Sequence, residues 1–326
     1  MRRQIPDDIL RAMSVLNSIY GAIVRAKNAL HERGTLRTRR LQGPVVSVGN
    51  LAVGGAGKTP FVILLGELLK ARGVEFDVLS RGYGRATTGV LLVDPHGKPQ
   101  EFGDEPLLIA RRLGVPVVVG EKRYEAGQFA ETQFGVRLHL LDDGFQHRAL
   151  ARDLDIVLVN ASDFEDRLLP GGRLREPLSA LKRASVVVLE EGVPYPARRL
   201  GRKTIWRVRR GVSLPALPPR VAAFCGVARP ERFFGQLRAA GVVAAVEIPF
   251  SDHHAYTEKD VRDLLAVKEE KNCAGFVTTE KDVINLQEHA GRLQPLFAAT
   301  VTMELVETES ALSLLMAQIP ARPAGL

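Results

Sequence analysis

The residues best suited to chemistry lie in one stretch, 45–60, where an apolar run leads into a glycine-rich loop. The loop ends in Gly57, Lys58 and Thr59, and an apolar pattern typical of a helix follows. Strand, glycine loop, Gly-Lys-Thr and helix follow one another in the order of a phosphate-binding P-loop. Glycines let backbone N–H groups close around phosphate oxygens because no Cβ stands in the way, and a helix N-terminus adds positive potential for the same anion.

This loop predicts a nucleotide site. We expect Lys58 to reach the β- and γ-phosphates and the Thr59 hydroxyl to hold Mg²⁺. The strict pattern has glycine where this chain has Ala52, and the alternative is a glycine-rich turn with an incidental lysine. The residues expected to bind the nucleotide are Gly54, Gly55, Ala56, Gly57, Lys58 and Thr59.

Two adjacent acids, Asp142 and Asp143, follow the apolar run 137–141. In a parallel sheet the carboxyl ends of the strands face the ligand, and an acid there holds Mg²⁺ in P-loop enzymes, directly or through water. A polar turn after a strand is the alternative. The P-loop upstream favours the metal role for at least one of the two acids.

Asp104 and His253 are candidates for proton transfer. Asp104 opens an apolar helical pattern, so on its own it is more typical of a helix N-cap. His253 lies next to His254, and adjacent histidines point apart, which argues against a metal site that uses both. A histidine paired with a carboxylate suits proton transfer near neutral pH, whereas a hydrogen-bonded surface histidine is the alternative.

Two glycine-containing turns carry arginines. Arg81 and Arg85 flank a turn after an apolar run, where two guanidinium groups could clamp phosphate or simply face solvent. Arg175 and Glu176 lie in a second turn that, taken alone, indicates a loop with a salt bridge.

The composition is that of a globular protein, and 326 residues suffice for two domains. The formal net charge is +8, and the first 40 residues supply +6 of it, from nine basic and three acidic residues. This balance suits an anionic membrane or a phosphorylated substrate. No RNA-binding signature or zinc spacing is present, so we expect no nucleic-acid partner. Cys225 and Cys273 form no CxxC pair, which fits a reducing cytoplasm.

The N-terminal segment predicts an amphipathic helix over 8–31, with basic residues beside an apolar stripe. No apolar run is long enough to span a membrane, and Asp7, Asp8 and Arg11 interrupt any signal peptide. Packing on the core and lying on a membrane surface are the two interpretations. The stripe consists of Ile9, Leu10, Met13, Leu16, Ile19, Tyr20, Ile23 and Val24.

Alternating apolar runs and helical patterns predict an α/β fold: a P-loop, doubly wound, mostly parallel sheet with a second, smaller α/β domain. We expect a kinase-like domain over 1–210 that includes a membrane-facing N-terminal part, 1–40, and is rejoined by the C-terminal helix 307–326. A linker at 211–220 and the smaller domain at 221–306 complete the chain. Expected strands are 45–49, 75–79, 90–93, 116–119, 137–141, 155–159, 185–189, 203–208, 221–225, 243–248, 274–278 and 299–305.

Taken together, these segments resemble the tetraacyldisaccharide 4′-kinase family, the lipid A 4′-kinases. A glycine-rich loop alone is moderate evidence, but the ordered set spans nearly the whole chain and is highly specific. The matching stretches are 47–60, 80–85, 103–106, 119–123, 141–147, 169–178, 224–230, 250–256 and 278–282.

The resemblance implies an ATP- and Mg²⁺-dependent kinase that phosphorylates the 4′-hydroxyl of a tetraacylated glucosamine disaccharide 1-phosphate, a glycolipid, to give lipid IVA in lipid A biosynthesis. It also implies peripheral attachment to the cytoplasmic side of the inner membrane through the N-terminal helix. Ala52 and Ala56 stand where many relatives have hydroxyl side chains, so only backbone contacts to phosphate are expected there.

Family roles carry over to matching positions. Asp104 and His253 match a carboxylate–imidazole pair that activates the acceptor hydroxyl, and these two residues fall in different predicted domains. Lys58 is expected to assist catalysis. The metal ligands are expected among Thr59, Asp142, Asp143 and Glu176. Basic residues suited to the acceptor's 1-phosphate are Arg81, Arg85, Arg123 and Arg175.

Two other functions remain open from the residues alone. A nucleotide-hydrolysing switch or scaffold protein at a membrane would also have the P-loop and the acidic strand end, but it would need no acceptor-activating pair. A kinase for a small soluble metabolite would not need the basic amphipathic N-terminus.

Overall fold

The computed structural model describes residues 7–318, with side chains from residue 16 onward. The chain forms two compact units, described one at a time below. Unit 1 comprises the described residues up to Lys58, the segment 127–208 and the described residues from Leu305. Unit 2 comprises 59–126 and 209–304. The predicted domain boundaries around 211–220 stay a prediction.

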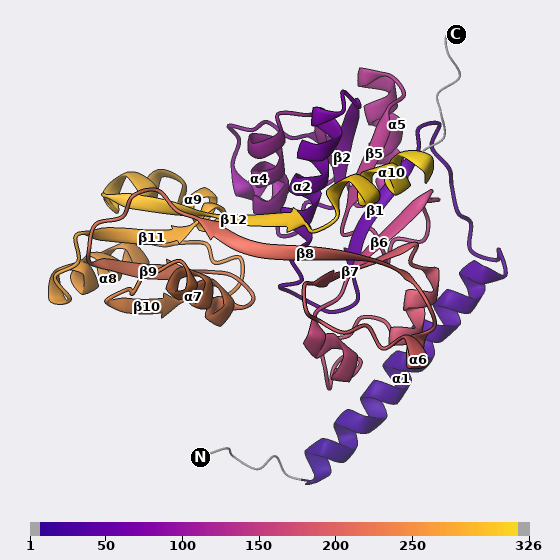
Figure 1. Ribbon diagram of the computed structural model, residues 1–326, viewed down its shortest axis with the longest axis horizontal. Helices are drawn as coiled ribbons and strands as arrows, with labels where there is room; N and C mark the ends of the chain where they lie inside the picture. The colour runs from indigo at the N-terminus through magenta and orange to yellow at the C-terminus, as the bar shows by residue number, and fades with distance from the viewer. Residues whose placement is uncertain (1–6, 319–326) are drawn as a thin grey trace. The chain divides into compact units, whose positions relative to one another are not determined.

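Unit 1 is built on a parallel sheet whose strand order is β5-β1-β6-β7-β8 (Figure 1). Its central strands are buried along their whole length, which explains why apolar residues occupy both parities in the sequence. The strands are β1 (Val45–Asn50), β5 (Leu138–Asp142), β6 (Leu154–Leu158), β7 (Val186–Glu190) and β8 (Thr204–Ser213).

The register of this sheet places functional candidates together. β1 pairs in parallel with β5, so that Val48 lies opposite Asp142. The loop after β1 and the acids after β5 therefore leave the same edge of the sheet, where parallel sheets bind ligands.

Helices and short 3₁₀ turns cover the sheet of unit 1. One face packs Val157, Val187 and Leu189 against Leu178 and Leu181 of a 3₁₀ turn. The helical elements of unit 1 are α1 (Asp7–Glu32), α5 (Arg123–Phe134), η1 (Ala161–Glu165), η2 (Leu178–Arg183), α6 (Ala197–Leu200) and α10 (Thr308–Gln318).

Unit 2 contains two sets of strands. In the first, β2 (Phe76–Ser80) pairs in parallel with β4 (Val117–Val119), and β3 (Leu91–Leu92) joins β4 in the antiparallel sense. Helix α2 (Lys58–Ala71) precedes β2, and α3 (Pro99–Phe102) and α4 (Asp104–Leu113) lie between β3 and β4.

The second set of strands is parallel, in the order β10-β9-β11-β12. The strands are β9 (Val221–Cys225), β10 (Val246–Pro249), β11 (Gly275–Thr279) and β12 (Leu296–Leu305). The helical elements between them are α7 (Pro230–Ala239), α8 (Glu258–Glu270), α9 (Glu280–Leu286) and η3 (Gln287–Arg292) (Figure 1).

Strand β9 shows how this second set is covered on both faces. Ala222 and Phe224 pack with Val261 of α8, whereas Ala223 packs with Phe233 of α7 on the opposite side. Successive side chains of a strand point to opposite faces, so a strand covered on both sides must be apolar at every position.

The α/β, mostly parallel fold expected from the sequence is confirmed, and β3 is an antiparallel exception. The segment expected to be a linker begins as strand, because β8 continues to Ser213. The helix expected over 281–289 instead changes into 3₁₀ geometry after Leu286.

We predict that Phe224→Ala strongly destabilises unit 2. The side chain is fully buried and meets the rings of Phe250, Tyr256 and Phe276, so truncation leaves a cavity in the centre of this packing. Such a change typically costs about 3–5 kcal/mol. Urea unfolding followed by circular dichroism should show a much lower midpoint, whereas Val243→Ala, at a side chain 79% exposed, should leave the midpoint nearly unchanged.

Candidate active site

The glycine loop follows β1 directly, and α2 begins at Lys58. Gly54, Gly55 and Gly57 all have positive φ angles, of 71°, 60° and 82°. These angles favour glycine and turn successive N–H groups toward one side, which makes an anion-binding concavity. The ammonium group of Lys58 donates to Asn50 Oδ1 at 3.1 Å.

Asp143 links this lysine to an arginine. Its Oδ1 lies 3.5 Å from Lys58 Nζ, and Arg175 donates to both carboxylate oxygens at 2.9 Å. Arg175 also contacts the side chain of Asn50. One carboxylate thus orders two of the cations expected to meet phosphate, in agreement with a site for a highly charged anion.

The residues at this edge also suit Mg²⁺, which prefers hard oxygen donors. Asp142 ends β5 and is nearly fully buried, and Asp143 follows it with its side chain 34% exposed. Across the described residues, no group of three or more His, Cys, Asp or Glu side chains is arranged to hold a metal. Mg²⁺ usually takes only one or two carboxylates together with phosphate oxygens and water, so this donor set fits it.

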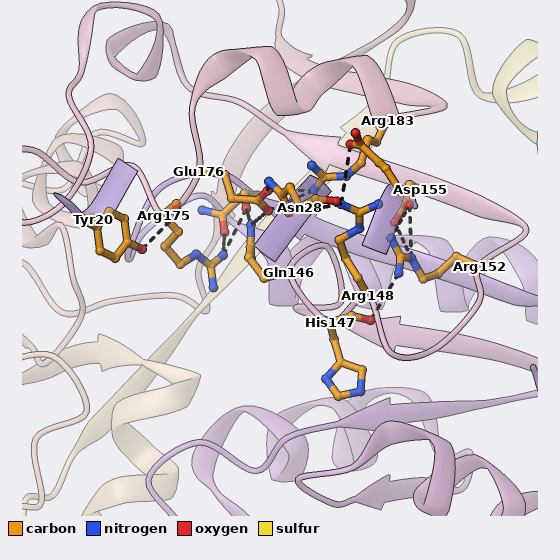
Figure 2. A network of polar contacts seen from close by, with 12 residues as sticks. Tyr20, Asn28, Gln146, His147, Arg148, Arg152, Asp155, Arg175, Glu176 and Arg183 are labelled. Atoms are coloured by element: carbon orange, nitrogen blue, oxygen red, sulfur yellow. Dashed lines mark hydrogen bonds and ion pairs between the residues drawn. The ribbon is translucent and has the colours of Figure 1, made fainter. Parts of the chain in front are cut away.

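Glu176 lies at the centre of a polar network that Gln146 joins to Asn50 (Figure 2). Asn28 of α1 donates to its Oε2 at 2.8 Å, while Gln146 and Arg183 donate to its Oε1 at 3.2 and 3.0 Å. Arg148 in turn donates to Asn28 at 3.0 Å. In this structure the carboxylate of Glu176 ties α1 to the sheet, and its expected role as a metal ligand stays a prediction.

Asp104 and His253 form a close pair within unit 2. The Nδ1 atom of His253 lies 3.0 Å from Oδ1 and 2.9 Å from Oδ2 of Asp104. Asn285 and the backbone N–H of Glu105 also donate to this carboxylate, at 2.9 and 2.8 Å. The expectation that the two residues meet is confirmed, although both belong to one compact unit.

The environment keeps Asp104 ionised. Burial alone raises the pKa of this carboxyl group, but the hydrogen bond from His253 and the charge of Lys281 outweigh burial and hold its pKa below the ordinary value. For His253, burial lowers the pKa, the bond to Asp104 raises it, and the net pKa lies above the ordinary value. A buried, ionised carboxylate beside an imidazole is what abstraction of a hydroxyl proton needs.

The loop that carries His253 is held in an unusual conformation. His253 has a φ of 56°, in the left-handed region that non-glycine residues seldom adopt, and its N–H donates to the carbonyl of Gly226 at 3.1 Å. The ring of His254 packs against those of Phe250 and Tyr256, with centroid distances of 4.7 and 4.9 Å. These contacts fix the loop that aims His253 at Asp104.

The four arginines expected to bind substrate have different environments. Arg81 is exposed, and Arg175 belongs to the Asp143 cluster. Arg85 instead pairs with Glu121 at 2.6 Å, and Arg123 donates to the carbonyl groups of Gly120 and Glu121. Contact with substrate stays a prediction for all four.

Several residues of these clusters were not predicted. Asn50 is the last residue of a buried strand and Gln146 follows another, a signal that could have identified them. Lys281 and Asn285 lie in and after the matched stretch 278–282, but no local pattern relates them to Asp104, which precedes Lys281 by more than 170 residues.

Helix α1 packs on unit 1 through polar side chains. The N–H of Gly171 donates to Asn17 at 2.7 Å, and Tyr20 donates to the carbonyl of Arg175 at 3.0 Å (Figure 2). The close contact near Gly21, where a Cβ would lie 3.1 Å from Leu168, completes this interface.

Part of the apolar stripe of α1 faces outward, whereas Tyr20 and Val24 are half-buried. Leu16, Ile19 and Ile23 are 52%, 52% and 62% exposed, and Leu30 is 39% exposed. Ile9, Leu10 and Met13 of the predicted stripe lie outside the residues whose side chains are described. Within the described residues, no helix has the length and hydropathy needed to cross a bilayer.

Comparison with known proteins identifies the family. A family model described as tetraacyldisaccharide-1-P 4′-kinase matches residues 9–320. The tetraacyldisaccharide 4′-kinase of Koribacter versatilis is 49% identical over 310 residues, covering 92% of this chain and 96% of that protein. The enzyme of the same name from Geobacter metallireducens is 38% identical over 323 residues, covering 92% and 95%.

A solved structure agrees with this result. A crystal structure of LpxK from Aquifex aeolicus in complex with ATP superimposes with a TM-score of 0.76 at 33% identity, covering 95% of this chain and 99% of that chain. With its P-loop, its acidic strand end and its Asp104–His253 pair, the chain belongs to the tetraacyldisaccharide 4′-kinase family.

Proposed function

We propose how the residues of this chain perform the lipid A 4′-kinase reaction. The γ-phosphoryl group of ATP passes to the 4′-hydroxyl of tetraacyldisaccharide 1-phosphate and gives lipid IVA. The observation that carries the proposal is the hydrogen-bonded pair of Asp104 and His253, because phosphoryl transfer to an alcohol needs a base at the acceptor. A nucleotide-hydrolysing switch would need no such base.

The glycine loop and Lys58 bind the phosphates of ATP. Backbone N–H groups of the loop and the lysine ammonium neutralise charge on the group in transit, which is where electrostatic catalysis contributes most. Thr59, Asp142 and Asp143 would hold Mg²⁺, with Glu176 as a further candidate. When bound, the ion neutralises the β- and γ-phosphate oxygens.

Asp104 is the general base. Because its pKa is held below the ordinary value, it is ionised at neutral pH and accepts the proton of the 4′-hydroxyl as that oxygen attacks phosphorus. His253 orients the carboxylate through Nδ1. Positioning of the acceptor oxygen in line with the leaving oxygen supplies much of the remaining rate enhancement.

The basic experiment is incubation with labelled ATP, with and without the disaccharide lipid. Label should move to the lipid. Release of inorganic phosphate at the same rate in both samples would instead indicate a hydrolytic switch.

We further propose that α1 attaches the protein to the cytoplasmic side of the inner membrane. Its polar face is occupied by contacts with the rest of unit 1, while Leu16, Ile19 and Ile23 of its apolar stripe are exposed. Basic residues beside the stripe, such as Arg25 and Lys27, suit anionic lipid headgroups.

We predict that Lys58→Ala lowers turnover by about 10² or more, since it removes a preorganised charge from the transferring group. The fold should be retained, because Asp143, the acidic partner of this lysine, keeps its pairing with Arg175. Steady-state assays with the lipid acceptor measure the loss, and Lys259→Ala, at a side chain 79% exposed, is the matched control. A change within about threefold for Lys58→Ala would contradict the P-loop role.

We predict that Asp104→Ala and His253→Ala each lower kcat strongly and leave ATP affinity nearly intact. The double variant should be little worse than the more impaired single variant, because members of one catalytic unit are not additive. Kinetics on all three proteins test this expectation. Losses that multiply would show that the residues act independently.

We predict that replacing Leu16, Ile19 and Ile23 together with serine weakens binding to anionic vesicles at least about tenfold, because apolar burial drives insertion into the interface. Added salt should weaken binding of the parent protein as well. Vesicle flotation measures both effects, and Val243→Ser in unit 2 is the control for loss of an exposed apolar side chain. Flotation that is unaffected by the serine substitutions and by salt would indicate that α1 serves only packing.

A further inference from the structure

Lys281 lies beside the Asp104–His253 pair, and several carboxylates surround its ammonium group. It is the second residue of α9, and its side chain is only 13% exposed. Its Nζ atom is 3.1 Å from Nε2 of His253, the ring nitrogen that does not face Asp104. Three carboxylates surround the same ammonium group: Asp252 at 3.4 Å, Asp104 at 3.7 Å and Glu105 at 3.8 Å.

The contact between Nζ and Nε2 restricts where protons lie. An ammonium group has donors only, so at hydrogen-bond distance Nε2 of His253 must accept and carry no proton. The remaining ring proton then lies on Nδ1 and is donated to Asp104. The reverse arrangement would need a neutral amine, but the carboxylates of Glu105, Asp104 and Asp252 offset the effect of burial and raise the pKa of Lys281.

We propose that Lys281 is a positioning residue that holds His253 as the neutral tautomer protonated on Nδ1. The inference rests on the proposed function, since it assigns a cause to the orientation of the proposed base. Lys281 transfers no proton itself. In the reaction the O–H bond of the acceptor breaks, an O–H bond forms on Asp104, and the lysine stays charged throughout.

This arrangement keeps Asp104 hydrogen-bonded to a neutral imidazole. A doubly protonated His253 would form a full ion pair with the carboxylate, and the opposite tautomer would remove the hydrogen bond that orients it. The positive charge of Lys281 at Nε2 disfavours both states and so opposes the bond to Asp104, which raises the pKa of His253. A charged side chain at this position therefore changes the protonation of the Asp104–His253 pair without contacting the acceptor.

The positions of Lys281 and His253 are both fixed through contacts with Gly226. Asp282, adjacent to Lys281, accepts from the N–H of Gly226 at 2.8 Å and from Tyr256 at 2.8 Å. The carbonyl of the same Gly226 accepts from the N–H of His253. The positions of the lysine and the imidazole are thus coupled through one buried turn, which explains how two flexible side chains keep a specific contact.

The experiment compares Lys281→Met, Lys281→Gln and Lys281→Arg with the parent, and uses Lys259→Met as the matched control on an exposed lysine. The readout is the pH dependence of kcat/KM. The charged groups that face His253 are Asp104 and Glu105 of α4, Asp252 of its own loop and Lys281 of α9. Of these four, only Lys281 is a cation.

Removal of this cation raises the pKa of both His253 and Asp104. Because activity needs the deprotonated forms, the acid limb of the profile should move to higher pH, by about one pH unit for Met and Gln. Lys281→Arg keeps the charge and should leave the limb nearly in place. The Met variant should also lose about tenfold or more in kcat at neutral pH, with little change in KM for ATP.

A second readout does not depend on activity. In protein labelled with ¹⁵N-histidine, the His253 signals, assigned by their loss in His253→Ala, should show an unprotonated Nε2 in the parent and in Lys281→Gln. They should show a changed protonation pattern in Lys281→Met. Thermal unfolding verifies that each variant is folded.

A parent tautomer with the proton on Nε2 would overturn the proposal, as would an acid limb and ring signals unchanged in folded Lys281→Met. These outcomes differ from failure of the proposed function. Full activity of His253→Ala would contradict the catalytic role of the Asp104–His253 pair. Loss of activity in His253→Ala, together with Lys281 variants that behave like the parent, would contradict only the role of the lysine.

Discussion

The parallel pairing of β1 with β5 and β6 is the constraint on which the nucleotide half of this enzyme depends. Parallel strands send their carboxyl ends to one edge, so the glycine loop after β1 and the acids after β5 must emerge together. Both strands are buried along their whole length, so this pairing lies inside the hydrophobic core. The contacts of Lys58 with Asn50 and Asp143 follow from that pairing.

The Asp104–His253 pair depends on a different physical requirement, which is to keep a buried carboxylate charged. Burial alone would favour protonation of Asp104. Three hydrogen-bond donors contact this carboxylate, namely the N–H of Glu105, the ring of His253 and the amide of Asn285, and the ammonium of Lys281 adds a positive charge 3.7 Å away. Together these contacts offset the cost of burial and hold the pKa of Asp104 below its ordinary value.

Helix α1 shows how one helix can serve two surfaces. It attaches to the rest of unit 1 through hydrogen bonds in which Tyr20 and Asn28 donate and the Asn17 side chain accepts, and it leaves Leu16, Ile19 and Ile23 exposed. A helix packed only for stability would have the opposite polarity, because burial of its apolar face would stabilise the fold more. The link from Asn28 to Glu176 also connects this surface helix to the acidic side chains of the site.

The sequence alone determined what depends on local pattern. Buried strands are apolar on both parities, and the P-loop carries its chemistry in consecutive residues, so the fold class, most element bounds and the nucleotide loop were predictable. The ordered motifs likewise indicated the family and the pairing of Asp104 with His253.

Only the tertiary structure decided the partners of individual charges. Glu176 is held by Asn28 and Arg183, Arg85 pairs with Glu121, and Lys281 reaches His253. Such contacts join residues from different elements through side-chain geometry. A charged residue looks the same in sequence whether it meets substrate, solvent or another side chain.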